Sequence, residues 1–348
     1  MSKTIRRIAR LLSVVTAVAI IAAAALLGSL AYFNAPPRGI PEPDSENGFL
    51  IFEIRPGESA HSVGRRFEDA GVIRNRHFWN LLARLSGEHI KAGTYRLELP
   101  ASQIKIRSIL VAGEQLLVRV TFPEGATLQR TAQILADAGI CGAEDFIAAA
   151  SSPEILAAFN IPGQTMEGYL FPDTYLFPLS YPAAKAAAAM AENFFRRLAV
   201  FAPESAAMTP AEINERVIMA SIVEREYRLA EEAALMAGVF NNRLKIGMPL
   251  QSCATVVYVI TEILGRPHPE RIFNRDLEIQ SPFNTYLWPG LPPGPISNPG
   301  ETALRAAFNP EQTNYLYFRL INAADGRHFF SRTLDDHIMA GALFVKGR

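Results

Sequence analysis

The chain has 348 residues, and its 34 basic and 34 acidic side chains give a formal net charge of zero. This balance excludes a global electrostatic attraction to nucleic acid or to an anionic surface. The length excludes a single small module, so we expect two or three domains that recognise their partners locally.

A single membrane-spanning helix is predicted over residues 11–33, which contain no charged side chain. A helix of that length can cross a hydrocarbon core of about 30 Å. Basic side chains precede the segment and acidic side chains follow it, so the positive-inside rule places residues 1–10 in the cytoplasm and the rest outside. A cleavable signal peptide is the alternative, but its apolar region is usually only about 7 to 15 residues long.

A small α+β module is expected after a tether. Residues 34–48 are rich in Pro, Gly and acidic residues and read as a linker. Over residues 49–116 the apolar pattern indicates strand, helix, helix and strand in that order. This order is similar to LysM-type glycan-binding modules, although many small α+β domains share it.

The strand, turn and helix pattern at the start of this module recurs 68 residues later, near residues 120–141. The offset matches Gly57 with Gly125 and Phe67 with Leu135, and it superposes two Asp-Ala-Gly triplets. Ser59 and Thr127 occupy the corresponding N-cap positions. We therefore predict a second related unit at the start of a larger α+β domain, residues 117–348.

An apolar helical run in this larger domain ends on a carboxylate. Thr209, Pro210 and Glu212 form a capping box that marks where the helix begins. Ile213, Val217, Ala220 and Glu224 then recur at helical spacing, so Glu224 continues an apolar stripe. A carboxyl group held there has a raised pKa and can serve as a general acid. The alternative is a structural ion pair between Glu224 and Arg225 or Arg228.

The sequence also indicates a stiff loop and aromatic segments that suit sugar binding. Residues 290–300 contain four prolines and three glycines, and residues 283–290 and 167–178 mix aromatic with polar side chains. The histidines and cysteines show no metal-binding spacing, and neither a nucleophile elbow nor a phosphate loop is present. We expect no metal and no cofactor. A disulfide between Cys141 and Cys253 is permitted outside the cytoplasm but is not indicated by the sequence.

The chain resembles the YceG-like (MltG) family of endolytic murein transglycosylases over nearly its whole length. The resemblance is carried by the ASIVERE helix, the Asn-Thr-Tyr motif followed by GLPPGPI, and the segments 239–252, 315–318 and 328–337. It implies a single-pass protein of the bacterial inner membrane, with its catalytic domain in the periplasm. The implied partners are peptidoglycan glycan strands and the cell-wall synthesis machinery.

Position by position, the resemblance puts the family's catalytic glutamate at Glu224. It also implies that substrate is bound by a set of residues at other motif positions: Asn242, Gln251, Thr255, Asn284, Tyr286 and His328. Arg243 occupies a further motif position. One departure is at Cys253 and Ala254, where family members commonly have Asp-Pro. This departure argues against an essential acid at that position.

The reaction that the resemblance implies is cleavage of the MurNAc–GlcNAc bond of nascent strands with formation of 1,6-anhydro-MurNAc ends. A sugar hydroxyl replaces water in this reaction, so one acid that also acts as base suffices. Two alternatives stay open. A catalytically silent glycan-binding scaffold needs only the LysM-like module, and a hydrolase needs a second acid, for which Glu167, Asp173 and Glu226 are candidates.

Overall fold

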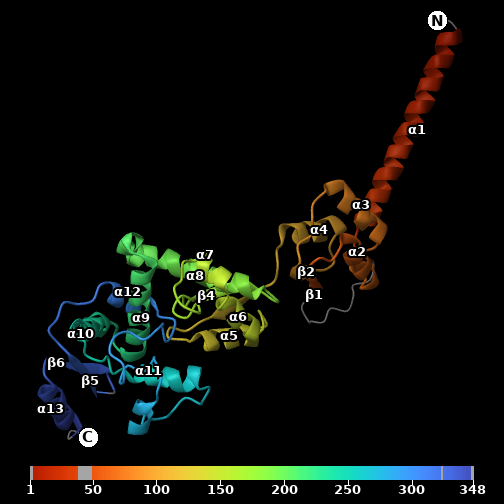
Figure 1. The fold of residues 1–348 in the computed structure, drawn as a ribbon. Coiled ribbons are helices and arrows are strands. Elements are labelled where there is room, and N and C mark those ends of the chain that lie inside the picture. The colour runs from red at the N-terminus through yellow and green to blue at the C-terminus, as the bar shows by residue number, and fades with distance from the viewer. Residues whose placement is uncertain (1–2, 38–48, 323, 346–348) are drawn as a thin grey trace. The chain divides into compact units, whose positions relative to one another are not determined.

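The computed structural model of the protein describes residues 3–37, 49–322 and 324–345. The chain divides into two compact units. The N-terminal unit comprises Met1–Leu117 with Pro178–Ser180, and the C-terminal unit comprises Val118–Phe177 with Tyr181–Arg348. Both units combine helices with two-stranded sheets, which confirms the predicted α+β class (Figure 1).

The N-terminal unit begins with the long helix α1, Lys3–Asn34, whose stretch Arg10–Asn34 is apolar and long enough to cross a membrane. The helix begins before the predicted span because the basic N-terminal residues continue it. Its last turn contacts the module that follows: Gln103 Nε2 donates to the carbonyl of Phe33 at 3.0 Å. Of the predicted linker, residues 38–48 lie outside the described residues.

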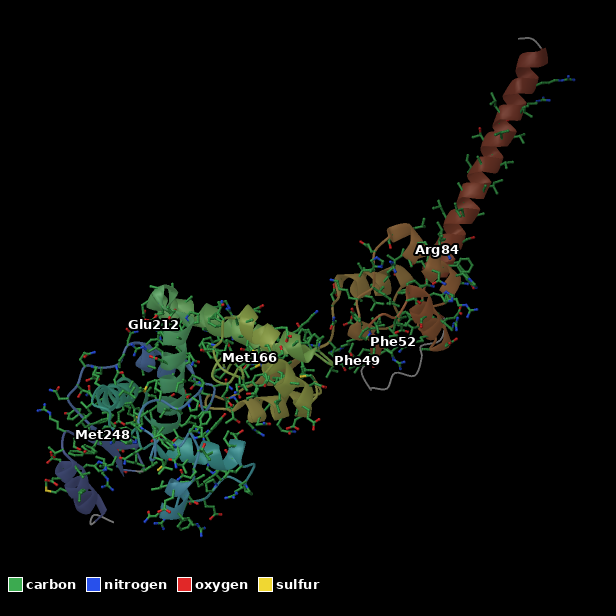
Figure 2. The ribbon with its side chains drawn as sticks, in the orientation of Figure 1. Phe49, Phe52, Arg84, Met166, Glu212 and Met248 are labelled. Carbon is green, nitrogen blue, oxygen red and sulfur yellow. The ribbon has the colours of Figure 1, made fainter. Side chains whose placement is uncertain are left out.

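The module pairs β1 and β2 in antiparallel register, with Phe49 opposite Glu98 and Ile54 opposite Gly93. Helices pack on this pair around Trp79, which is fully buried and donates its indole N–H to the carbonyl of Ala60 at 2.8 Å. Figure 2 shows Phe52 of β1 among the side chains of this unit. The elements of the module are β1 (Phe49–Ile54), α2 (Ala60–Asp69), α3 (Arg76–Ser86), β2 (Gly93–Glu98) and α4 (Gln103–Ala112).

The C-terminal unit is mainly helical, with one large apolar core and two separate strand pairs, β3 with β4 and β5 with β6. Figure 1 shows α9 standing beside α12 in this unit, and α9 also packs against α10 and α11. Its strands are β3 (Leu117–Thr121), β4 (Thr174–Pro178), β5 (Tyr317–Asn322) and β6 (Arg327–Ser331). Its helices are α5 (Leu128–Asp137), α6 (Ala143–Ala150), α7 (Pro153–Ala158), α8 (Ala183–Phe201), α9 (Pro210–Glu226), α10 (Ala233–Lys245), α11 (Cys253–Tyr258), α12 (Glu301–Phe308) and α13 (Leu334–Val345).

Two segments, the first repeat (residues 54–73) and the second repeat (residues 120–141), have the same local geometry. Gly57 and Gly125 have φ of 77° and 73° in the turns, where a left-handed backbone favours glycine. Ser59 accepts a hydrogen bond from the backbone of the third residue after it, and Thr127 accepts the equivalent bond. After each helix the chain again passes through a left-handed glycine within the Asp-Ala-Gly triplet.

Candidate active site

Helix α9 carries the predicted acid to the edge of the core. The capping box forms as expected: Glu212 N–H donates to Thr209 Oγ1, and Thr209 N–H donates to the Glu212 carboxylate. Figure 2 shows Glu212 at the start of this helix. The residues from Val217 to Val223 are all buried, so this part of the helix is enclosed on every side and the predicted stripe runs through it. Glu224 is the first partly exposed residue after this run.

Glu224 is held by the stiff loop. Gly300 N–H donates to Glu224 Oε2 at 2.9 Å, and the Tyr227 hydroxyl hydrogen-bonds the same carboxyl group. Burial and, to a smaller extent, the charge of Glu124 raise the pKa of Glu224 to about 7, against the opposing effects of the Gly300 N–H, Arg225 and the Tyr227 hydroxyl. A substantial fraction of this carboxyl group is therefore protonated at neutral pH, as a general acid requires.

A second carboxylate, Glu124, faces Glu224 across Gly300. A Cβ added to Gly300 would collide with the Glu124 carboxylate, so a larger residue there would displace the Glu124 side chain. Both carboxylates touch this one residue, which puts them within about 7 Å of each other. The neighbouring Gly125 also lies against the site, because a Cβ there would be 3.5 Å from Glu224 Cγ. The turn of the second repeat thus forms one wall of the site.

Asn298 connects this turn to the stiff loop. Its side chain is 1% exposed, and Asn298 Oδ1 accepts hydrogen bonds from the backbone N–H groups of Gly168 at 2.8 Å and Leu170 at 3.1 Å. Asn298 Nδ2 donates to the carbonyl of Ala126 at 2.9 Å, and the Asn298 carbonyl accepts from Gly125 N–H. One buried amide therefore joins three chain segments behind Glu224.

The stiff loop is also fastened to α9 itself. Ser221 Oγ accepts a hydrogen bond from Ile296 N–H at 3.0 Å, and Ser297 Oγ donates to the carbonyl of Ser221 at 3.2 Å. Ser221 is fully buried. These bonds fix the position of the stiff loop, and therefore of Gly300, relative to Glu224.

Arg225, the residue after Glu224, lines two cavities. The first, of about 390 Å³, is lined by Glu124, Gly125 and Arg225 together with Tyr258 of α11 and His268. The second, of about 440 Å³, is lined on its far side by residues of β5 and β6. Because Arg225 borders both, the two cavities are neighbours on one surface of the C-terminal unit. An extended polymer can occupy adjoining hollows of this kind.

Comparison with known proteins identifies the family. The model of the YceG-like family matches residues 52–341. The chain belongs to the YceG-like family. It is 29% identical over 327 residues to an endolytic murein transglycosylase of Bacillus subtilis, and the match covers 88% of each chain.

Other relatives extend this comparison. The chain is 28% identical over 318 residues to an endolytic murein transglycosylase of Streptococcus pneumoniae, a match that covers 83% of this chain but spans only 57% of the pneumococcal protein. A crystal structure of a putative yceG-like protein from Listeria monocytogenes superposes with a TM-score of 0.56 at 30% identity, covering 84% of this chain and 99% of that one.

Two of the residues predicted to bind substrate in this YceG-like protein line the second cavity. Gln251 is exposed there, with a left-handed backbone of φ 51° that is unusual for a residue with a side chain. His328 is 9% exposed, and its Nδ1 lies 2.7 Å from Glu232 Oε2. Arg243, another motif residue, also lines this cavity.

The other predicted substrate-binding residues have different surroundings. Thr255 and Asn284 have no exposed surface, so neither can contact a sugar in this structure. The Thr255 hydroxyl hydrogen-bonds Thr285 Oγ1. Asn284 Nδ2 donates to the carbonyls of Leu277 and Ile279. Both side chains therefore stabilise the conformation of residues 277–285. In this structure their role is therefore to support the surrounding chain, and contact of either residue with substrate stays a prediction.

Asn242 and Tyr286 border neither cavity. Asn242 Nδ2 donates to the carbonyls of Thr313 and Tyr315 and so holds the chain that leads into β5. The Tyr286 hydroxyl lies 3.0 Å from the sulfur of Cys253. Cys253 and Cys141 are both free thiols.

The three acids considered for a hydrolase are bound to partners other than Glu224. Both carboxylate oxygens of Glu167, a 4% exposed residue, accept a hydrogen bond from Leu128 N–H at the start of α5. Asp173 pairs with Arg197 at 3.0 Å. Glu226 accepts a hydrogen bond from Ser252 Oγ and lines the second cavity.

Sequence reasoning missed Glu124 and Asn298. Glu124 lies in the turn of the second repeat, directly before the glycine that matches Gly57, so its position in a repeated turn was a usable signal. Asn298 lies in the stiff loop that was singled out for its prolines and glycines. Its contacts bridge 128 to 172 residues of sequence, and no local pattern encodes them.

Proposed function

We propose that this protein is a membrane-anchored endolytic murein transglycosylase that cleaves the MurNAc–GlcNAc bond of peptidoglycan strands. The observation that carries the proposal is Glu224, a half-buried acid with a pKa of about 7 that accepts the Gly300 N–H, and whose neighbours Glu124, Gly125 and Arg225 line the first cavity. Membership of the YceG-like family supports it, since relatives in two bacteria are named endolytic murein transglycosylases.

In the proposed reaction Glu224 acts first as an acid and then as a base. Its proton passes to the glycosidic oxygen as the bond from that oxygen to C1 breaks. The C6 hydroxyl of the same MurNAc then forms a bond to C1, and its proton passes to the Glu224 carboxylate. The product carries a 1,6-anhydro ring, no water is consumed, and the acid is regenerated.

The groups around Glu224 suit both steps. Glu124 places negative charge nearby, which helps to keep the proton on Glu224 before cleavage. The Gly300 N–H is a donor to the carboxylate that forms after proton transfer. Asn298 keeps the turn and the loop in register, so that these groups are positioned before substrate arrives.

The anchor and the module complete the proposal. Helix α1 would cross the inner membrane once with its N-terminus in the cytoplasm, which leaves the module and the C-terminal unit in the periplasm beside newly made strands. The LysM-like module, residues 49–116, would bind glycan, and residues 117–348 would form the catalytic domain. Proteins of the cell-wall synthesis machinery are the expected neighbours at that location.

The substitution Glu224→Gln tests the catalytic assignment. Glutamine keeps an acceptor for Gly300 N–H but has no proton to give, so release of anhydro-ended fragments should fall by about 100-fold or more. Glu215→Gln, an exposed position on the same helix, is the matched control and should retain wild-type release. Fragment release by the Glu224→Gln protein at the wild-type rate would remove Glu224 from the mechanism.

A hydrolase is the second candidate, and Glu124 is the observation that favours it. Glycosidases place two carboxyl groups about 5 to 9.5 Å apart, and the upper limit of about 7 Å between Glu124 and Glu224 is compatible with a pair of this kind. The mass of the product decides, because a hydrolase leaves reducing ends that are heavier by one water. Reducing ends from purified strands would replace the transglycosylase proposal by this one.

A further inference from the structure

The second cavity is rich in arginine and poor in acid. Four arginines line it: Arg225, Arg228, Arg243 and Arg319. They come from three separate parts of the chain, namely the end of α9 and the residues after it, α10, and β5. Among the described lining residues only Glu226 is acidic. The positive charges therefore outnumber the negative charges around this hollow.

None of these arginines forms an ion pair within the described part of the chain. Arg225 donates to the carbonyl of Gly125, and Arg319 donates to that of His337. Arg243, only 8% exposed, donates to three carbonyls, including Leu316 at 2.6 Å and Leu250 at 2.7 Å. Carbonyl groups satisfy the hydrogen bonds of a guanidinium group but do not neutralise its charge.

The nearby acids are already engaged. Glu226 accepts the Ser252 hydroxyl, and burial raises its pKa, which favours the neutral form. Glu232 is bound to His328. The charge of this region also shows at His337, whose pKa is lowered by burial and by Arg319 and Arg243. The cavity thus has uncompensated positive potential, which an incoming anion would relieve.

We infer that the second cavity binds a carboxylate of the peptidoglycan strand, through the guanidinium groups of Arg228 and Arg319 beside the more deeply held Arg243. The inference rests on the proposed function and adds a substrate feature to it. The sugar rings of the strand are uncharged, and its carboxylates are carried by the substituent of MurNAc. Arg225 borders both cavities, so a strand cleaved at Glu224 would present this substituent next to the arginines.

Two chemical sources can supply the carboxylate. In complete strands the stem peptides carry it, and in strands stripped of peptide the lactyl group of MurNAc carries it. Arginine binds either one through paired hydrogen bonds. Because Arg225, the residue after Glu224, borders this cavity, the contact would select MurNAc-bearing strands over uncharged glycans at the point of cleavage.

The test uses the full-length protein in detergent and three substrates: strands with stem peptides, peptide-free strands with lactyl carboxylates, and strands whose carboxylates have been converted to amides. The double variant Arg228→Gln with Arg319→Gln should raise KM about tenfold or more on a carboxylate-bearing substrate, with kcat within about twofold of wild type. On amidated strands wild type and variant should have the same KM. Arg119→Gln, an exposed position on β3, is the matched control.

The source of the carboxylate follows from which of the two charged substrates shows the effect. An unchanged KM on both charged substrates, or an equal rise on the amidated strands, would overturn the inference. Binding of strands to Glu224→Gln protein, with and without the arginine changes, measures the contact without turnover. If wild type cleaves nothing, the proposed function fails, and this binding measurement still decides whether the arginines recognise carboxylate.

Discussion

The first and second repeats share a turn, a helix cap and a terminating glycine. They differ in the groups that form hydrogen bonds with the turn. In the first repeat the partners are local: Glu58 accepts from Arg55 N–H and pairs with Arg66 at 2.7 Å. In the second repeat the turn is bonded to Asn298, and the first N–H of α5, that of Leu128, is bonded to Glu167. One turn is self-contained, and the other depends on distant segments.

The difference shows how one local design serves two purposes. A self-contained turn supports a small module whatever surrounds it. A turn that leaves its backbone groups for distant partners can be fixed against another element, here the end of α9, and its Glu124 then faces Glu224. The distant hydrogen-bond partners of its turn place the second repeat at the candidate active site, while the caps and glycines are the same in both repeats.

The largest effect is expected from removing the hydrogen bonds of Asn298, which connect the second repeat to the stiff loop. Asn298→Ala leaves the N–H groups of Gly168 and Leu170 buried without an acceptor, which should destabilise the C-terminal unit by about 3 kcal/mol. Activity should fall by about 100-fold, because the turn and Gly300 lose their register with Glu224. Chemical unfolding and fragment release measure the two effects.

The isosteric change Asn298→Asp guards against a trivial loss of folding. It keeps the acceptor for Gly168 and Leu170 but replaces the donor to the Ala126 carbonyl by an oxygen. Its kcat should fall by a larger factor than any loss of folded protein explains, and its KM should stay near that of wild type. Equal stability and equal kcat to wild type in this protein would show that Asn298 does not position the turn.

The next largest effect is expected from a change at Glu124, which tests whether this carboxylate acts on Glu224. Glu124→Gln removes the charge that helps to raise the pKa of Glu224, whereas burial, Arg225, Tyr227 and the Gly300 N–H still act on that group. The pKa of Glu224 should therefore fall, and the basic limb of kcat/KM should move down by up to about one pH unit. Activity at pH 8 should drop about threefold to tenfold, with less change below pH 6.

This substitution also divides the two candidate reactions. If Glu124 only sets the charge around Glu224, the profile shifts while activity persists at low pH. If Glu124 is the second acid of a hydrolase, Glu124→Gln should lose about 100-fold or more at every pH. A pH profile that superposes on that of wild type would mean that Glu124 does not act on Glu224.

The sequence predicted what depends on neighbouring residues. The capping box of α9, the caps of both repeats and the apolar helix α1 rest on spacings of three or four residues or on a continuous run, and the structure has them. The stripe on α9 did not indicate how far burial extends, because all residues from Val217 to Val223 are buried, on the other faces of the helix too.

The remainder of the candidate site could not be predicted, because it is made of contacts between remote segments. Gly300 reaches Glu224 across 76 residues, and Asn298 reaches Gly168 across 130. Thr255 and Asn284 show the converse. Their residue types suit sugar binding, but the fold turns their polar groups inward, and residue type alone does not reveal that direction.

The smallest effect is expected in the first repeat, where Glu58→Gln removes one ion pair within the module. Although burial opposes it, the hydrogen bonds from Arg66, Arg55 and Ser62 lower the pKa of Glu58. The ion pair therefore stabilises the module above the ordinary carboxyl pKa and is lost as the pH falls through the lowered value. The loss at pH 7 should be about 1 kcal/mol, because Arg66 is partly exposed.

Cleavage by the Glu58→Gln protein should remain at the wild-type rate, since the contacts of this turn stay inside the module. Thermal unfolding at pH 7 and pH 3 checks the stability, and the difference between variant and wild type should shrink at the lower pH. A fall in cleavage as large as that of Glu124→Gln would mean that the first turn also serves the catalytic site, and the contrast between the two repeats would be wrong.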